Sequence, residues 1–221
     1  MPHRRNGFNG EEDYWESDED ERMEDDEGWI DLAEPEVHIS PELRAAMDAA
    51  EVGDVDALCV ALDNLNSSID QPAEDGDNAL HLACLYGYTP CVQLLLERRS
   101  SLDSKDEDGA IRLHDACAGG FVDIVQALLN AAENKDHIKR LLDTVDIDGD
   151  TPLHHAARGE HLEVVQVLLN VGASPIVTNV LGKTADDLAD SGSEVWQVLD
   201  AAGITMLIAN KELISTGKEL I

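Results

Sequence analysis

Basic and aromatic residues are both scarce in this sequence of 221 residues. Only 15 lysines and arginines stand against 47 acids, so the formal net charge is −32. A chain this acidic repels nucleic-acid phosphates and anionic lipid headgroups, and we therefore expect neither as a direct partner. Aromatic residues make up 4% of the chain, whereas 43% of it is hydrophobic. Small aliphatic side chains must therefore build the core, which favours closely packed helices.

Cysteine is also scarce, and long apolar runs are lacking. The four cysteines are Cys59, Cys84, Cys91 and Cys117. They show no CxxC spacing and lie within apolar helical patterns, so we expect reduced, buried thiols. The first residues contain no apolar segment of the secretory type, and no run approaches the roughly 18 apolar residues of a membrane helix. These features predict a soluble protein of the cytoplasm, the nucleus or both.

Motifs of catalysis and cofactor binding are missing as well. The sequence contains no P-loop, no GxGxxG after a strand, no GxSxG and no HExxH. His154, His155 and His161 lie close together in the sequence but lack the spacing of a zinc site. We therefore expect neither an enzyme nor a metal or cofactor site.

One short segment recurs along the chain. Residues 77–83 read DNALHLA, residues 110–116 read AIRLHDA and residues 150–156 read DTPLHHA. A glycine precedes each copy, and a fourth glycine follows, at spacings of 33, 40 and 33 residues. These glycines are Gly76, Gly109, Gly149 and Gly182. Pairs of leucines downstream keep the first two spacings, so the chain contains an internal repeat.

The repeated unit resembles the ankyrin repeat, a turn followed by two antiparallel helices with the signature T-P-L-H-x-A. Residues 151–156 match the signature fully, whereas the other two copies keep Leu-His and lose Thr-Pro. The flanking segments 43–58 and 182–189 resemble degenerate end units, as expected where one face of a unit meets water. The resemblance implies an all-α ankyrin-repeat solenoid of about five helix-turn-helix units, three of them clear. It also implies that the repeated His81, His114 and His154 hydrogen-bond adjacent turns.

The repeat defines three parts of the chain. We expect an acidic N-terminal tail over residues 1–40, a repeat domain over 41–204 and a short C-terminal tail over 205–221, which is frayed helix or an alternative end. The spacing of 40 marks seven extra residues in the third unit. They fall within residues 130–142, and we expect them to lengthen the second helix or its exit loop. The expected units are about 42–74, 75–107, 108–147, 148–180 and 181–204.

The N-terminal tail has a composition of its own. It contains 15 acids and three arginines, a net charge of −12, and should be disordered when alone. Yet it holds four of the eight aromatic residues of the chain. Tyr14, Trp15 and Trp29 lie among acids, a mixture suited to wrapping a basic surface, with rings packed on guanidinium groups. Ser17, which precedes a run of acids, resembles a site for an acidophilic kinase.

Acids also gather at the turns of the repeat. The Asp before each glycine can stabilise the turn through local hydrogen bonds. Further acids at these turns are not required for that purpose: they are Glu74, Asp77, Glu107 and Asp150. A row of such carboxylates would attract a ligand rich in Lys and Arg. The alternative is a merely solvated face.

Two tyrosines lie where the first helix of the second unit is expected to end. Tyr86 and Tyr88 are candidate anchors of an interface, because large aromatic side chains dominate many binding surfaces. The alternative is that they pack within the loop.

These features together predict a monomeric protein–protein interaction module that binds a basic protein client. In size, repeat number and acidity the chain is similar to small acidic ankyrin proteins that escort a newly made ribosomal protein. That similarity implies an escort chaperone for a ribosomal or other cationic protein. The alternative is a general ankyrin scaffold or adaptor, in signalling or protein turnover, whose acidity serves solubility only.

Overall fold

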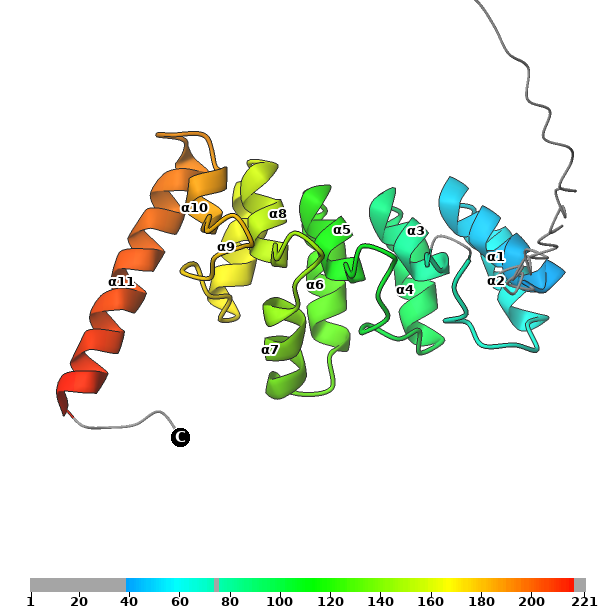
Figure 1. Cartoon of the computed structure of the whole chain (residues 1–221). Helices are drawn as coiled ribbons and strands as arrows, with labels where there is room; N and C mark the ends of the chain where they lie inside the picture. Colours follow the sequence, from blue (N-terminus) through cyan, green and yellow to red (C-terminus); the bar gives the residue numbers. More distant parts are fainter. Residues whose placement is uncertain (1–38, 74–75, 217–221) are drawn as a thin grey trace, which may run out of the picture. The chain divides into compact units, whose positions relative to one another are not determined.

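A computed structural model describes residues 39–73 and 76–216 of the protein. Within these two ranges the chain forms eleven α-helices and no strand (Figure 1). The helices are α1 (Pro41–Val52), α2 (Val55–Asp63), α3 (Ala79–Leu85), α4 (Thr89–Glu97), α5 (Arg112–Ala118), α6 (Val122–Ala131), α7 (Lys135–Asp143), α8 (Pro152–Arg158), α9 (Leu162–Asn170), α10 (Ala185–Leu188) and α11 (Glu194–Thr216). Five helix pairs, α1/α2, α3/α4, α5/α6, α8/α9 and α10/α11, follow one another, which confirms the predicted all-α solenoid.

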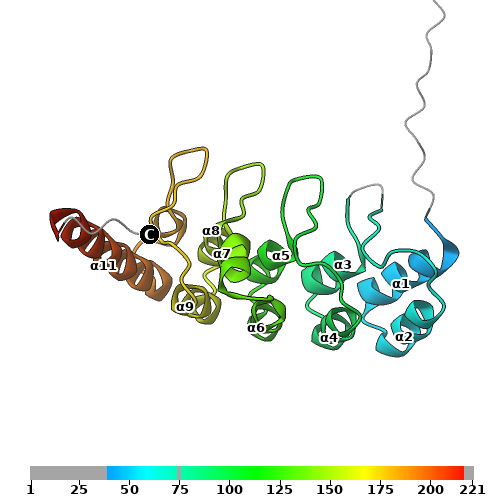
Figure 2. The same cartoon turned by 90° about the horizontal axis from the view of Figure 1, so that it is seen from below.

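The helix pairs stack in two layers. The first helices of the pairs (α1, α3, α5, α8 and α10, here the inner layer) contact one another in sequence order. The second helices (α2, α4, α6, α9 and α11, here the outer layer) do the same. Figure 2 shows both layers and the turn loops before α5, α8 and α10, which project on the side of the inner layer. Small side chains let the layers approach closely, as the composition predicted: alanines and leucines fill most of the buried core.

An aromatic or imidazole ring closes each junction between units at the same place. Tyr88, Phe121 and His161 are each half-buried just before a second helix. A β-carbon added at Gly53 would lie 2.5 Å from the Tyr88 ring, and one added at Gly87 would lie 2.5 Å from the Phe121 ring. Only glycine leaves room for the ring of the following unit, so the glycines of the short helix–helix loops are packing requirements.

The extra residues of the third unit form a separate helix. The expectation was a longer second helix or exit loop, but α6 ends at Ala131 and α7 begins at Lys135. The side chain of Asn134 caps α7 by accepting from the backbone N–H of His137. His137 is itself buried, with Nε2 3.1 Å from a carboxylate oxygen of Asp103. Local capping and this contact with the preceding unit explain why the helix breaks and restarts.

The two ends of the repeat domain differ from each other. At the N-terminal end, Ser40 caps α1 by accepting from the backbone N–H of Leu43, so this helix begins at Pro41. At the other end α11 runs without interruption through residue 204, where the repeat domain was expected to stop. No helix in the described part is both long enough and apolar enough to cross a membrane. All four cysteines are free, and all but the partly exposed Cys59 are buried.

Candidate protein-binding surface

The turn loops are held by the residue three positions before each glycine. Oδ1 of Asp106 accepts from the backbone N–H of Ala110 at 2.8 Å. Oδ1 of Asp146 accepts likewise from Asp150 at 2.9 Å. From the sequence, the side chain of the Asp directly before the glycine was predicted to have this role. At Asp108 it is instead the backbone oxygen that acts, by accepting from the N–H of Ile147 in the next loop at 2.7 Å.

Two buried histidines connect α5 and α8 to the turn that follows each. Nε2 of His114 lies 3.2 Å from the backbone oxygen of Asp150, and Nε2 of His154 lies 3.1 Å from that of Lys183. These contacts confirm the role that the resemblance implied for His114 and His154, whereas Nε2 of His81 has no hydrogen-bond partner among the described residues. Burial lowers the pKa of His114 to about 4 and also lowers the pKa of His154. Both rings are therefore neutral at physiological pH, and their function is structural.

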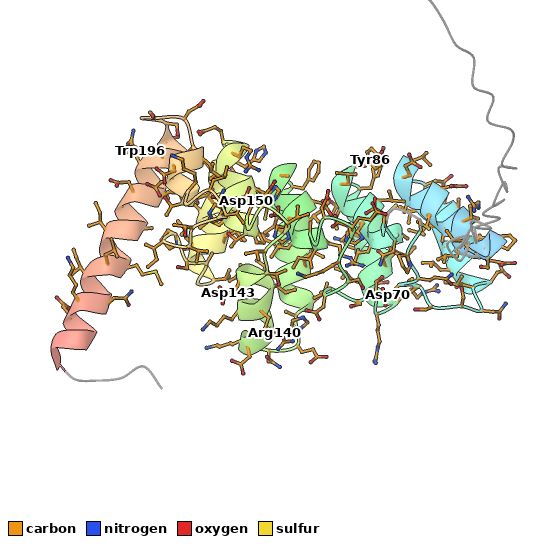
Figure 3. All side chains as sticks on the ribbon, in the orientation of Figure 1. Asp70, Tyr86, Arg140, Asp143, Asp150 and Trp196 are labelled. Carbon is orange, nitrogen blue, oxygen red and sulfur yellow. The ribbon has the colours of Figure 1, made fainter. Side chains whose placement is uncertain are left out.

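In the fourth unit, side chains of the chain itself contact the turn carboxylates. Nε2 of His155 lies 2.7 Å from Oδ2 of Asp146. Arg158 forms an ion pair with Asp150, whose other oxygen accepts from Nδ2 of Asn179 at 2.7 Å. Asp150 is completely buried. Asp150 was predicted to be a free carboxylate at an exposed edge, but it lies inside the stack and ties two turn loops together through Asn179. Figure 3 labels its position.

At the junction of the second and third units, the carboxyl groups of Asp77, Asp106 and Asp115 interact with one another. Asp106 has the place of Asp146, but Asp115 replaces His155. Burial, followed by the charges of Asp106 and Asp77, raises the pKa of Asp115 to about 8. We call Asp77, Asp106 and Asp115 the acidic junction.

One buried cation lies beneath the acidic junction. Arg112 is fully buried at the first position of α5, where α8 has proline. Its Nη1 donates to the backbone oxygen of Ser104, while Nε and Nη2 have no hydrogen-bond partner among the described residues. The Arg112 charge opposes the upward shift in the pKa of Asp115, yet that pKa remains raised.

His81 adds no positive charge to this junction. Its Nδ1 lies 3.6 Å from Oδ1 of Asp77, but burial and the nearby Arg112 lower its pKa to about 3. One ligand atom each of Asp77, His81 and Asp106 lie within 4.8 Å of one another, so this group has the donor types of a divalent-cation site. The expectation that the protein holds no metal stays a prediction.

Exposed apolar side chains lie at the end of the inner helix of the second unit. Leu85 and Tyr86, at the end of α3, are each 48% exposed. Leu85 has the place in its unit that Arg158 has in the fourth unit, so an exposed leucine stands where the other unit supplies a cation. Figure 3 shows Tyr86 at the end of α3. Tyr88 is different, because its half-buried ring packs over Gly53 and supports the unit junction.

Comparison with known families agrees with this geometry. A family model described as ankyrin repeats (3 copies) matches residues 46–137, and a second, described as ankyrin repeats (many copies), matches residues 113–169. Together they span more than half of the chain. The chain belongs to the ankyrin-repeat proteins. A search among curated proteins gave no significant match.

As an ankyrin-repeat protein, the molecule is a protein–protein interaction module, and members of this family are generally non-enzymatic. The predicted contact residues are distributed unevenly over it. Glu107 is exposed at a turn, Asp77 is half-buried in the acidic junction, and Tyr86 is exposed beside it. The others lie outside the described residues: Glu74, Tyr14, Trp15, Trp29 and the modification candidate Ser17.

The sequence did not lead us to predict one residue of the acidic junction, Asp115, or the neighbouring Arg112. Asp115 follows the repeated histidine, where the neighbouring units have Leu82 and His155. Arg112 stands where the signature has proline. Comparison of equivalent positions between the units would have identified both, whereas counting acids at the turns alone could not.

Proposed function

We propose that this ankyrin-repeat protein binds a basic protein client at the acidic junction and the neighbouring apolar side chains of Leu85 and Tyr86. The observation that carries this proposal is the interaction of Asp77, Asp106 and Asp115 at one place: burial, followed by the charges of Asp106 and Asp77, raises the pKa of Asp115 to about 8. The whole chain carries a net charge of −32. A cationic side chain would be attracted by Asp77 and Asp106 and would favour the ionised form of Asp115.

The fourth unit supports the choice of a cationic ligand. At equivalent positions it places His155 on Asp146 and Arg158 on Asp150. The second and third units offer Asp115 and Leu85 at those positions. A Lys or Arg of the client would therefore make the contacts that the fourth unit makes within the chain.

Leu85 and Tyr86 would supply the apolar part of the interface. Interfaces combine a few large anchors with surrounding polar groups, and aromatic residues are enriched among the anchors. The charge of the whole chain would speed the approach of a basic client, and the local contacts would then hold it. The acidic tail, with Tyr14, Trp15 and Trp29, would be a second arm on the same client.

An escort for a ribosomal or other cationic protein fits this surface, because such a client needs its charge covered until assembly. The competing function is a general scaffold in signalling or protein turnover, with acidity for solubility only. The two differ in how their binding responds to salt. Contacts between a −32 chain and a basic client weaken steeply as salt rises, whereas contacts with a neutral client do not.

The test uses the full chain to capture salt-extracted ribosomal proteins at increasing salt. The junction variant combines Asp77→Asn, Asp106→Asn and Asp115→Asn; asparagine at position 106 keeps the turn acceptor, as Asn179 does in its own turn. We expect capture at low salt, release at high salt and about tenfold weaker binding by this variant.

The matched control makes the same number of carboxyl-to-amide changes in the outer layer. It combines Glu97→Gln, Asp123→Asn and Glu163→Gln, all exposed on α4, α6 and α9. This control should weaken binding by less than about threefold. If both variants lost the same amount of client binding, the net charge of the chain rather than the acidic junction would explain the binding. If the chain captured mainly neutral proteins and kept them at high salt, the scaffold function would be supported.

A further inference from the structure

Helix α11 carries two apolar stripes, and only one of them packs on the repeat stack. Val195 and Leu199 are buried, and Gly203 and Met206 are half-buried. Met206 contacts the loop after α9, where Oγ of Ser174 lies 3.6 Å from its sulfur. This stripe ends the solenoid by covering its last units.

The second stripe is exposed. Ile204, Leu207 and Ile208 are 51%, 50% and 53% exposed, respectively. Figure 1 shows the C-terminal half of α11 extending past the ends of α9 and α10. A surface helix normally shows one apolar face and one polar face, so a second apolar stripe indicates a second surface to be covered.

The charges on this face have opposite signs. At about 100° per residue, Asp200 and Lys211 lie on the same side of the helix as Ile204, Leu207 and Ile208. Both charged positions are accessible: Lys211 is exposed and Asp200 is half-buried. The charges of Asp200 and Lys211 therefore cancel along the centre of this face, with Glu212 at its edge, although the chain carries −32.

These residues are arranged symmetrically along the helix. The midpoint between Asp200 and Lys211 lies between Thr205 and Met206 in the sequence. The midpoint between Ile204 and Leu207 is the same. A second α11 that runs antiparallel about this point would place Asp200 opposite Lys211 at both ends and Ile204 opposite Leu207 in the middle. We propose that α11 docks antiparallel on α11 of a second copy of this chain.

Self-complementarity is what favours a second copy over another occupant. A two-fold interface uses the same patch on both partners, so its charges must pair after rotation. Asp200 and Lys211 do so only in the antiparallel arrangement, because a parallel one would oppose like charges. A basic client would gain nothing from a face whose central charges cancel, and the acidic tail would bring only further negative charge.

The dimer is expected to be weak and reversible. The shared face spans about three helical turns, well below the roughly 800 Å² per partner of a standard stable interface. Repulsion between two chains of −32 opposes it, and salt screens that repulsion. Association should therefore strengthen as salt rises, opposite to the salt dependence proposed for the client. It also departs from the monomer expected from the sequence.

Sedimentation equilibrium of the full chain tests the association, over roughly micromolar to millimolar concentrations. We expect a concentration-dependent dimer, weakened at least about tenfold by Ile204→Ser with Leu207→Ser. Both side chains are exposed, so the stack should remain folded. The matched control is Val60→Ser on the outer layer, where Val60 is 63% exposed, and it should leave dimerisation unchanged.

Disulfide trapping tests the register. In a Cys59→Ser background, Ile204→Cys chains are mixed with Leu207→Cys chains under mild oxidation. The antiparallel register predicts that the mixed 204–207 disulfide exceeds both like-with-like disulfides. A preference for the 204–204 disulfide would overturn the register, and a monomer at every concentration would overturn the proposal. If the full chain stayed monomeric and only the chain without residues 1–38 dimerised, the occupant of this face in the full chain would be the tail rather than a second copy.

The α11 proposal can fail without affecting the proposed function. Its variants lie on the last helix, and client capture depends on residues of the second and third units. Conversely, a chain that dimerises but captures no basic protein would contradict the proposed function and leave the α11 proposal intact.

Discussion

Nε2 of His155 lies 2.7 Å from Oδ2 of Asp146, whereas the equivalent residues of the preceding unit are Asp115 and Asp106. One unit thus pairs an imidazole with its turn carboxylate, and the other places two carboxyl groups together. On the same helical scaffold, the contact between His155 and Asp146 is stabilising, whereas the interaction between Asp115 and Asp106 is unfavourable when both are ionised. The unfavourable pair is where a partner's charge would have the largest effect.

The acidic junction should make stability fall as pH rises towards 8. The pKa of Asp115 is raised from its usual 3.8 to about 8, so between these values the folded state holds a proton that the unfolded state has lost. Folding is therefore progressively penalised as pH rises through this range. Asp115→Asn removes the penalty. Its gain in unfolding free energy over the wild type should be at least about 1 kcal/mol larger at pH 8 than at pH 5.

Urea unfolding at several pH values measures this difference. Asp123→Asn, an exposed acid on α6, is the control and should shift stability equally at both pH values. A gain for Asp115→Asn that did not change with pH would show that Asp115 is already ionised in the folded protein at pH 5.

The buried histidines should lower the stability of the folded protein in acid. The pKa of His81 is lowered to about 3 and that of His114 to about 4, both chiefly by burial. Below about pH 6.5 the unfolded chain takes up protons that the folded chain does not, so stability should fall as pH decreases from about 6.5 to 4. NMR should show that neither ring titrates between pH 7 and 5. A midpoint near the usual 6.5 for either ring would contradict this.

Two Gly→Ala substitutions should have opposite effects on stability, because an aromatic ring covers one of the two glycines and not the other. Gly119 has an ordinary helical backbone, but an added β-carbon would overlap the ring of Phe121. Gly119→Ala should therefore cost about 1–3 kcal/mol through overpacking. Gly203 lies within α11, and its added β-carbon would meet only Ile176, at 3.9 Å. Gly203→Ala should stabilise that helix by up to about 1 kcal/mol.

Chemical denaturation of both variants is the measurement. Phe121→Leu should recover part of the loss in Gly119→Ala, since the smaller side chain leaves room. If both glycine substitutions changed the unfolding free energy equally, overlap with the Phe121 ring would not be the cause of the loss in Gly119→Ala.

Sequence periodicity was enough to predict the repeat domain. Spacings of 33 residues and the repeated Leu-His reflect one helix pair stacked on the next, and each pair needs the same buried positions. The extra residues of the third unit could not be placed in this way, because the break between α6 and α7 depends on the Asn134 cap and on a contact between His137 and Asp103. The spacing of the repeated residues gives no information about such a contact between units.

The candidate surface was only partly predictable, because burial decides the role of an acid. Asp150 and Glu107 looked alike as surplus carboxylates at turns. Folding buries the first among Arg158 and Asn179 and leaves the second in solvent. The acidic junction likewise exists only when Asp77 and Asp106 of the second unit meet Asp115 of the third.

Alanine substitution at these two acids should separate structure from binding. Asp150→Ala leaves the Nδ2 group of Asn179 and the guanidinium of Arg158 without their acceptor, so it should cost about 2–3 kcal/mol of unfolding free energy. Glu107→Ala changes an exposed side chain and should stay within about 0.5 kcal/mol. Thermal unfolding at matched pH and salt checks both values.

The same two variants should behave oppositely in client capture. At a temperature where both are folded, Asp150→Ala should capture basic proteins as the wild type does, because its carboxylate is buried against its own chain. Glu107→Ala should release them at lower salt, since an exposed carboxylate near the acidic junction contributes to attraction. If Asp150→Ala weakened capture while remaining fully folded, the buried ion pair would have to open on binding, and Arg158 rather than the acidic junction would be the first contact to examine.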